Sequence, residues 1–407
     1  MMITKISSCN VFDGKHNELL CNKTVYIQDN KILKIGDLDT PIKPDIEIDG
    51  KGKYLIPGLI NLHVHINRRH LSRGTGVFRQ GAPAVENSDD GRRMLYAAKN
   101  AWFELFKGIT TIRDLCSVGR TANYLRNAIQ AGQIRGPRLI TCGMAIAATG
   151  GHETHRYVGA VQVDGADEVT KATRYEIRLG ADFIKLMVSG GLGGMPEHEH
   201  PSWSELNVTE ITAACEAAHS HNRGVTVHAM GELPVLNALH GGVDGIEHGA
   251  VLTEEALRIM KDRNVYYVPT ASGITAVAEK EAKNGSSELA ETMRALVVDP
   301  QRESIRKAHE RGILIGAGSD TLGSVLAELL IFSDCGLSNT EALKTATSNA
   351  AKILKLDEKI GYVREGYLAD LVLLDENPLE DLHALEKVHT VFKDGNKVTF
   401  DWVCNLV

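Results

Sequence analysis

Apolar runs alternate with amphipathic stretches through the middle of the chain. Eight runs of four to seven residues have this character, at residues 59–65, 110–114, 138–142, 182–187, 225–229, 245–248, 266–270 and 314–320. Continuous apolar runs of this length are typical of strands covered on both faces, and the stretches between them have helical periodicity. Strands that alternate with helices form parallel sheets, and eight of them predict a (β/α)8 TIM barrel of the α/β class over residues 57–357.

The two ends of the chain have a different pattern. Short alternating runs separated by turn residues occupy residues 1–56, and two further strand-like runs, 370–374 and 388–392, lie near the other end. Antiparallel strands joined by tight turns have this pattern. We therefore expect residues 1–56 and 358–407 to form one small β-sandwich domain beside the barrel.

Two connections in the barrel region are unusually long. Residues 66–91 follow the first predicted strand and residues 271–300 follow the seventh. Most connections in compact domains have only a few residues, so long ones often serve a function. We expect both segments to be loops at the mouth of the barrel.

Composition and charge exclude several classes of partner. The chain has 407 residues, of which 43% are hydrophobic, and a formal charge of −7 with both signs interspersed, so binding to nucleic acid or to an anionic membrane is not expected. No apolar run predicts a signal peptide or a membrane span. The seven cysteines are widely spaced and include no Cys-x-x-Cys pair, which fits a reduced protein of the cytoplasm.

Candidate chemistry begins at the end of the first predicted strand, with His63 and His65. Side chains two residues apart on a strand point to the same face, so both imidazoles can reach one cation. The pair alone is ambiguous, because two histidines hydrogen-bonded within the barrel would look the same in the sequence.

Four further polar residues lie on other predicted strands of the barrel. Lys185 interrupts the apolar run of the fourth strand, where a buried ammonium needs a partner or neutralisation. His228 and His248 end the fifth and sixth strands, and Asp320 ends the eighth. Barrel enzymes place their catalytic residues at the carboxyl ends of the strands, so the sequence predicts one polar site there.

In this order the six residues resemble the ligand set of the amidohydrolase superfamily. The resemblance covers nearly the whole chain, including an entry segment at residues 55–61 and an exit segment at residues 366–375. It implies that CO2 converts Lys185 into a carbamate that bridges two divalent ions. His63, His65 and Asp320 would bind one ion, and His228 and His248 the other.

Nitrogen and oxygen ligands without sulfur suit zinc, so Zn2+ is the expected metal. Two such ions lower the pKa of a bridging water, which becomes the attacking hydroxide. By the same resemblance Asp320 would act as the general base that takes the proton of this water and as the acid that passes it to the leaving group.

Two glycine-rich segments narrow the resemblance to one branch. Residues 150–152 (Gly-Gly-His) follow the third strand and residues 189–191 (Ser-Gly-Gly) follow the fourth. Both are similar to segments of the prolidase-like and imidazolonepropionase-like branch, which includes Xaa-Pro dipeptidases and zinc carboxypeptidases. The resemblance gives His152 a catalytic role in contact with substrate, and the alternative is a histidine that caps a rim loop. Those dipeptidases usually carry a tyrosine where this chain has Met230.

Two other polar segments are less specific. Residues 197–200 (Glu-His-Glu-His) are rich in potential ligands, but a solvated loop is expected there rather than a third metal site. The first long connection holds five cationic or titratable side chains that could bind a substrate carboxylate or simply lie on the surface. These are Arg68, Arg69, His70, Arg73 and Arg79.

The sequence therefore predicts a cytoplasmic, homo-oligomeric binuclear zinc hydrolase that cleaves an amide bond in a small molecule, a dipeptide or an N-acyl amino acid. Hydrolysis of a cyclic amide is an alternative, although relatives with that activity typically use one metal and lack the lysine. Esters, lactones and phosphoesters are further alternative substrates, because the shape and chemistry of the pocket decide which electrophile is attacked. A non-catalytic scaffold is disfavoured, since all six ligand positions are filled.

Overall fold

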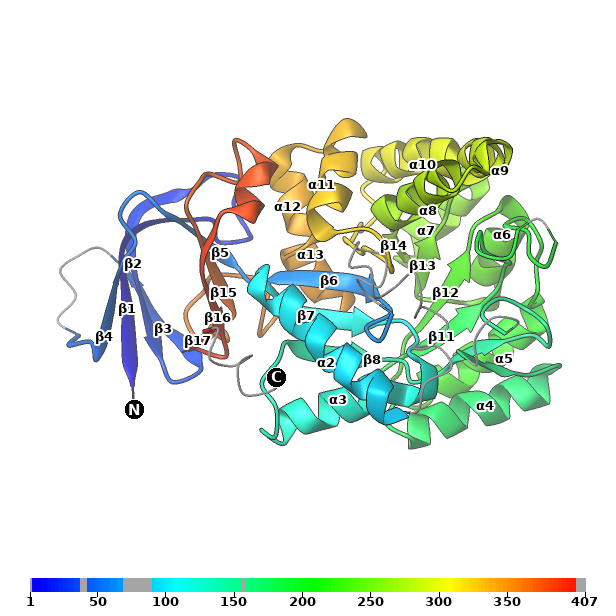
Figure 1. Ribbon diagram of the computed structural model, residues 1–407, viewed down its shortest axis with the longest axis horizontal. Helices are drawn as coiled ribbons and strands as arrows, with labels where there is room; N and C mark the ends of the chain where they lie inside the picture. Colours follow the sequence, from blue (N-terminus) through cyan, green and yellow to red (C-terminus); the bar gives the residue numbers. More distant parts are fainter. Residues whose placement is uncertain (1, 37–41, 69–89, 155–158, 196, 400–407) are drawn as a thin grey trace.

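The chain folds into a β-sheet module and a larger α/β region that lie side by side along the longest axis of the molecule (Figure 1). The computed structural model describes residues 2–36, 42–68, 90–154, 159–195 and 197–399. Among these residues no helix is both long enough and apolar enough to cross a membrane.

The sheet module draws its strands from both ends of the chain. Its strands are β1 (Ile3–Val11), β2 (Leu20–Gln28), β3 (Lys31–Gly36), β4 (Ile46–Asp49), β5 (Tyr54–Pro57), β15 (Leu371–Leu374), β16 (Val388–Lys393) and β17 (Asn396–Lys397). They form one sheet in the order β17-β16-β15-β5-β1-β2-β3, and β4 also pairs with β1. The two ends meet where β5 pairs with β1 on one side and with β15 on the other.

The sequence predicts a sandwich for this module, and hydrogen bonding instead joins all of its strands in one continuous sheet. Figure 1 shows β1–β3 facing β15–β17 across the module. Apolar side chains from both groups share one buried cluster, which includes Ile6, Val25, Leu371 and Phe392. The sheet therefore folds over its own core, and β5 provides the hydrogen-bonded link between the two halves.

The α/β region contains two parallel sheets. The first has the order β6-β7-β8 and the second β10-β9-β11-β12-β13-β14. The strands are β6 (Leu59–Val64), β7 (Ile109–Asp114), β8 (Arg138–Thr141), β9 (Ala145–Ala147), β10 (Ala160–Gln162), β11 (Ile184–Met187), β12 (Val225–Ala229), β13 (Gly245–His248) and β14 (Tyr266–Val268). The short strands β9 and β10 are absent from the prediction.

Backbone hydrogen bonds connect the edges of the two sheets. The amide of Asp182, just before β11, donates to the carbonyl of Thr141 in β8 at 2.8 Å. The segment 314–320 forms an isolated bridge to β14, and Leu62 in β6 donates to the carbonyl of Ala317 at 2.9 Å. Residues 314–320, predicted as the eighth strand, thus lie between β14 and β6.

Helices pack around these strands (Figure 1). They are α2 (Asp90–Phe106), α3 (Thr121–Gln130), α4 (Ala166–Arg178), α5 (Val208–His219), α6 (Glu232–Gly241), α7 (Glu254–Arg263), α8 (Ala271–Lys283), α9 (Ser287–Met293), α10 (Asp299–Glu310), α11 (Val325–Asp334), α12 (Asn339–Thr345) and α13 (Ser348–Ile353). Two of them begin with a capping box, at Asn207 with Glu210 and at Ser338 with Glu341.

The prediction of a long loop over residues 271–300 is wrong. This segment holds α8, α9, a π-helical turn (Arg294–Val298) and the start of α10. The amides of Ala271 and Ser272, which begin α8, donate to the carboxylate of Glu328 at 2.9 and 2.7 Å. A distant side chain thus satisfies the start of this helix, and local sequence gives no sign of it. Most of the other predicted loop, residues 69–89, lies outside the described residues.

Candidate metal centre

Three predicted ligands converge at the end of β6. One nitrogen each of His63 and His65 and one oxygen of Asp320 all lie within 4.8 Å of one another. His65 Nε2 is 3.5 Å from Asp320 Oδ1. The spacing is set by the backbone, because the amide of Asp320 donates to the carbonyl of His63 at 2.8 Å. This arrangement can hold one divalent cation on two nitrogens and one oxygen.

His228 and His248 lie beside this group. The ring centroids of His63 and His248 are 5.0 Å apart, and those of His228 and His248 are 4.4 Å apart. The two strands are neighbours, with Ala229 of β12 opposite His248 of β13. All four imidazoles are buried. The structure therefore brings the predicted histidines of three strands into one cluster.

Lys185 lies in β11, beside the strand that carries His228. Its side chain is 1% exposed, and its Nζ has no hydrogen-bond partner among the described residues. Burial lowers the pKa of this amine to about 8. An amine that is buried, uncharged in part and without a partner is suited to carbamylation, and the nitrogen and oxygen donors around it suit a pair of divalent ions. The residues present therefore fit the metal centre implied by the sequence.

Neighbouring groups fix the orientation of the histidine rings. Nδ1 of His63 lies 2.8 Å from Glu247 Oε2, and Nδ1 of His65 lies 2.8 Å from the carbonyl oxygen of Cys116. Nδ1 of His248 lies 2.7 Å from the hydroxyl of Thr270. An imidazole that uses Nδ1 in this way presents Nε2 to a cation, as metal-binding histidines commonly do.

Glu247 is a functional residue that the sequence reasoning missed. Its other oxygen accepts hydrogen bonds from Arg113 Nη2 at 2.5 Å and from Thr226 Oγ1 at 2.6 Å. Burial by itself would raise the pKa of this carboxyl, but the charge of Arg113 and the hydrogen bond with His63 hold it well below its usual range. The signal available in the sequence is its position, since Glu247 directly precedes His248 in a short apolar run.

The pKa shifts suit ligands of a cation. Burial lowers the pKa of His63 to about 4 and lowers the pKa values of His228 and His248 well below their ordinary value, so the rings are neutral near pH 7. For Asp320, burial opposes ionisation, but the neighbouring His63 and His65 hold its pKa far below the usual range. The centre thus offers neutral nitrogen lone pairs and a carboxylate.

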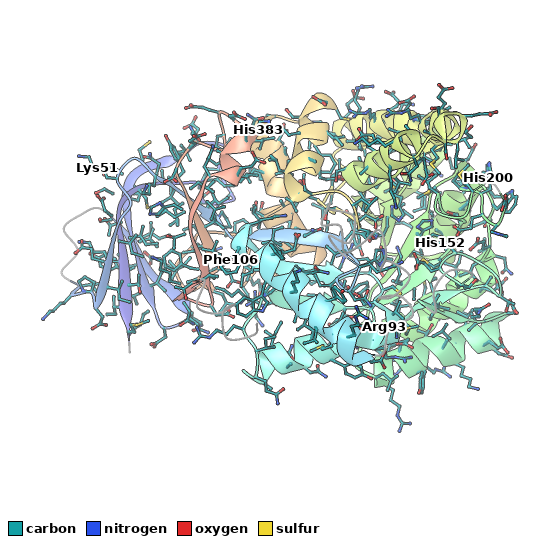
Figure 2. All side chains as sticks on the ribbon, in the orientation of Figure 1. Lys51, Arg93, Phe106, His152, His200 and His383 are labelled. Atoms are coloured by element: carbon teal, nitrogen blue, oxygen red, sulfur yellow. The ribbon has the colours of Figure 1, made fainter. Side chains whose placement is uncertain are left out.

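His152 lies at the edge of this cluster. Its ring stacks on that of His228, with centroids 4.2 Å apart and planes inclined by 26°. Nδ1 of His152 lies 2.6 Å from Glu199 Oε2. Burial lowers the pKa of His152, but the hydrogen bond and the charge of Glu199 outweigh this effect and raise it. Figure 2 shows His152 and His200 at the far end of the molecule from Lys51.

The segment 197–200 is only partly the solvated loop that the sequence predicts. Glu197 and His198 are exposed, whereas Glu199 is 2% exposed and bound to His152. Among the predicted carboxylate-binding residues, Arg68 is buried and pairs with Glu153 at 2.8 Å. Arg69, His70, Arg73 and Arg79 lie outside the described residues.

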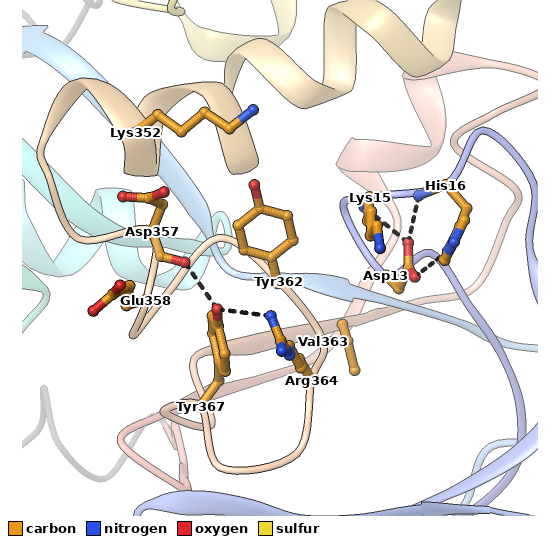
Figure 3. A pocket seen from close by; sticks show the side chains of 10 residues that line it. All are labelled: Asp13, Lys15, His16, Lys352, Asp357, Glu358, Tyr362, Val363, Arg364 and Tyr367. Carbon is orange, nitrogen blue, oxygen red and sulfur yellow. Dashed lines mark hydrogen bonds and ion pairs between the residues drawn. The ribbon is translucent and has the colours of Figure 1, made fainter.

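A cavity of about 680 Å³ lies elsewhere, at the junction of the sheet module with α13 (Figure 3). Tyr362 and Tyr367 line it together with charged side chains such as Lys352 and Arg364. None of the candidate metal ligands is among its lining residues. This cavity is therefore separate from the histidine cluster.

Comparisons with known proteins identify the family of this chain. The sequence model of the amidohydrolase family matches residues 54–398. An ochratoxinase of Aspergillus niger is 29% identical over 419 residues, which cover 95% of this chain and 82% of the relative. The predicted resemblance to the amidohydrolases is thereby confirmed.

Solved structures show which branch of the family this chain is similar to. A Xaa-Pro dipeptidase with methionine bound in its active site superposes with a TM-score of 0.88 at 30% identity, covering 97% of this chain and 99% of the other. A prolidase complexed with N-methylphosphonate-L-proline gives a TM-score of 0.86 at 29% identity, with 98% and 100% covered. These neighbours confirm the predicted likeness to the prolidase-like branch.

Proposed function

This chain belongs to the amidohydrolase family, and from that premise we propose that it is a binuclear metal-dependent hydrolase that cleaves the amide bond of a dipeptide or an N-acyl amino acid. Hydrolysis is the common activity of the relatives named above. Beyond hydrolysis, we propose the number of metal ions, their identity and the class of substrate.

One observation carries the proposal, namely the burial of the Lys185 side chain without a hydrogen-bond partner among the described residues. Burying an amine that has no hydrogen-bond partner within the described part of the chain is costly, and few structural roles would retain one near three histidines and an aspartate. As a carbamate the side chain would become an anionic ligand with two oxygens, which removes the burial problem. We assign the two ions, as zinc, to six residues. These are His63, His65, Lys185, His228, His248 and Asp320.

Two divalent ions held there would activate a water for attack and polarise the substrate carbonyl. The protein's own residues supply the remaining steps. Asp320 takes the proton of the attacking water on its carboxylate and then donates it to the nitrogen of the leaving amine. Glu247 and Thr270 hold the rings of His63 and His248 in place throughout, and His152 contacts the substrate from the edge of the cluster.

The proposed substrates are amides of amino acids, because relatives in this branch include a Xaa-Pro dipeptidase and a prolidase. Met230 replaces the tyrosine usual in such dipeptidases, and it packs in an apolar cluster with Leu192, Met195 and Ile274. A thioether offers no strong hydrogen bond to a peptide amine or carboxylate. Because of this difference, we propose N-acyl amino acids as well as dipeptides as the substrate class.

Family membership also supports the predicted architecture. In this proposal the two parallel sheets form one closed (β/α)8 barrel over residues 57–357, with the hydrogen bonds of residues 314–320 as its closing contacts. The sheet module comprises residues 1–56 and 358–407. The proposed protein is a homo-oligomer of the cytoplasm, and its partner is the small-molecule substrate.

Metal analysis and a substrate panel test the proposal together. Protein grown with zinc is expected to hold about two ions per chain, and removal of the metal by a chelator is expected to abolish activity until zinc is returned. The panel contains dipeptides, N-acyl amino acids, cyclic amides, lactones and phosphoesters, with release of amine or acid as the readout. Inactivity of the metal-loaded protein on the first two groups would refute the substrate class.

A further inference from the structure

Glu199 differs from its neighbours in the segment after β11. Its side chain is 2% exposed, whereas the side chains of Glu197 and His198 are 81% and 62% exposed. Burying a carboxylate is unfavourable unless it is paired and hydrogen-bonded. The burial of Glu199 therefore requires specific partners, and the fold supplies them.

One oxygen of Glu199 takes two hydrogen bonds. Oε2 lies 2.6 Å from His152 Nδ1 and accepts from the backbone amide of Gly191, also at 2.6 Å. A second carboxylate, that of Glu205, accepts from the backbone amide of His152 at 2.8 Å. The segment after β11 thus holds both the ring and the backbone of His152, which belongs to the segment after β9.

Glycine makes this contact possible. A Cβ at position 191 would lie 2.3 Å from Cε1 and 2.7 Å from Nδ1 of His152, which leaves no room for a side chain. At position 151 a Cβ would lie 2.6 Å from Glu205 Oε2. The His152 ring also stacks on that of His228 at 4.2 Å. The ring is therefore enclosed both by backbone and by a candidate metal ligand.

Because Nδ1 of His152 is hydrogen-bonded to Glu199, Nε2 is the ring nitrogen that can contact a substrate. Nε2 lies 3.9 Å from Glu153 Oε1, which is too far for a hydrogen bond. We propose that Glu199 is a positioning residue that sets the orientation of His152, so that Nε2 faces an anionic or carbonyl oxygen of the bound substrate. This inference rests on the proposed function, since it concerns the substrate of the same site.

A double-mutant cycle tests the inference. The variants are Glu199→Ala, His152→Ala and the double variant, with Glu197→Ala as the matched control from the same segment. Removing an outer residue that orients a site group typically costs about 10–100-fold in activity. We expect a loss of this size in kcat/KM for Glu199→Ala, no further loss on adding it to His152→Ala, and wild-type kinetics for Glu197→Ala.

Glu199→Gln provides a rescue. Because both hydrogen bonds reach the same oxygen, the amide oxygen of glutamine can accept both, and this variant is expected to recover most of the activity lost in Glu199→Ala. Metal content is expected to match that of the wild type in every variant. Thermal unfolding is measured so that kinetics are compared at a temperature at which every variant is folded, because Glu199→Ala leaves the buried amide of Gly191 without its acceptor. If Glu199→Ala is unstable, Glu199→Asp, which keeps the charge but withdraws it from His152 by one carbon–carbon bond, replaces it in the cycle.

The outcomes separate the two proposals. A wild-type protein that carries metal but hydrolyses neither dipeptides nor N-acyl amino acids overturns the proposed function, and this inference with it. An active wild type in which Glu199→Ala behaves like Glu197→Ala, or in which the losses from Glu199→Ala and His152→Ala multiply in the double variant, overturns the positioning role alone.

Discussion

Glu247 links the histidine cluster to the interior of the α/β region. It accepts from His63 on one oxygen and from Arg113 and Thr226 on the other, and it is fully buried. The carboxylate therefore does two things at once, since it neutralises a buried guanidinium and orients a candidate metal ligand.

We expect Glu247→Gln to weaken both stability and metal binding. Removing one partner of a buried pair leaves the other charge uncompensated, at a cost of about 3–5 kcal/mol in the free energy of unfolding. Loss of the carboxylate behind His63 should also lower metal affinity by about 10–100-fold. Urea unfolding and metal retention against a competing chelator measure these effects. Glu255→Gln, a change at an exposed residue, is the control, and equal behaviour of the two variants would contradict the role.

In the proposed mechanism Asp320 has a different role, at the reacting atoms. Asp320→Asn keeps an oxygen near His63 and His65 but removes the proton acceptor. We expect kcat to fall by about 100–10,000-fold while much of the metal is retained. Steady-state kinetics and metal analysis of the same preparation check this expectation. Full activity of the Asp320→Asn variant would refute the assignment of Asp320 as general base and acid. Loss of all metal in this variant would show that Asp320 acts as a metal ligand and would leave no support for the proton-transfer role.

The start of α8 depends on a side chain from another helix. Glu328 of α11 accepts from the amides of Ala271 and Ser272, two of the donors that a helix leaves unpaired at its first turn. Apolar residues of α8, among them Ile274 and Ala278, pack in the same cluster as Met230. The helix therefore packs against the segment that follows His228.

We expect Glu328→Ala to loosen this helix. Two buried amides would lose their acceptor, at a cost of about 1–3 kcal/mol for each group left unsatisfied. Hydrogen exchange should show faster exchange at residues 271–275 than in the wild type, and urea unfolding should show the loss of stability. Glu291→Ala, at an exposed position in the adjacent α9, should change neither. Unchanged exchange in the Glu328 variant would refute its capping role.

At the scale of the whole molecule, Asp370 joins the sheet module to the α/β region. Its carboxylate pairs with Arg138 of β8 at 2.5 Å and with Lys393 of β16 at 3.2 Å. Burial by itself would raise the pKa of this carboxyl, but the charges of Lys393 and Arg138 outweigh burial and hold it below the ordinary value of 3.8. The carboxylate is therefore favoured in the folded state.

This shift predicts an acid-dependent contribution to stability. A depressed folded-state pKa stabilises the protein at every pH above the unfolded value, and the contribution is lost as pH falls through the folded-state value. We expect Asp370→Asn to lower the free energy of unfolding by about 3–5 kcal/mol at pH 7. The difference from the wild type should shrink below pH 3.8. Unfolding measured across this range checks both statements. A loss well below about 3 kcal/mol at pH 7 would refute the first, and a difference independent of pH would refute the second.

Local pattern was enough to predict most strands of the α/β region, although not β9 and β10, and to indicate the six candidate ligands. The pleat of a strand puts residues two apart on one face, which indicated His63 and His65. A charge within an apolar run indicated Lys185, and the carboxyl ends of successive strands indicated His228, His248 and Asp320. Each of these signals depends only on neighbouring residues, so the sequence alone determined them.

Long-range contacts decided the rest. Glu247 meets Arg113 across 134 residues, Glu199 meets His152 across 47, and Glu328 meets the start of α8 across 56 to 57. Before folding, Glu199 and Glu328 look like a solvated charge and a helix residue. Glu247 lies in a predicted strand, but nothing near it in the chain shows which residues will pair with it. The sequence by itself determined which residues could bind metal, and only the tertiary structure decided which carboxylates hold them in place, because burial and pairing are properties of the packed chain.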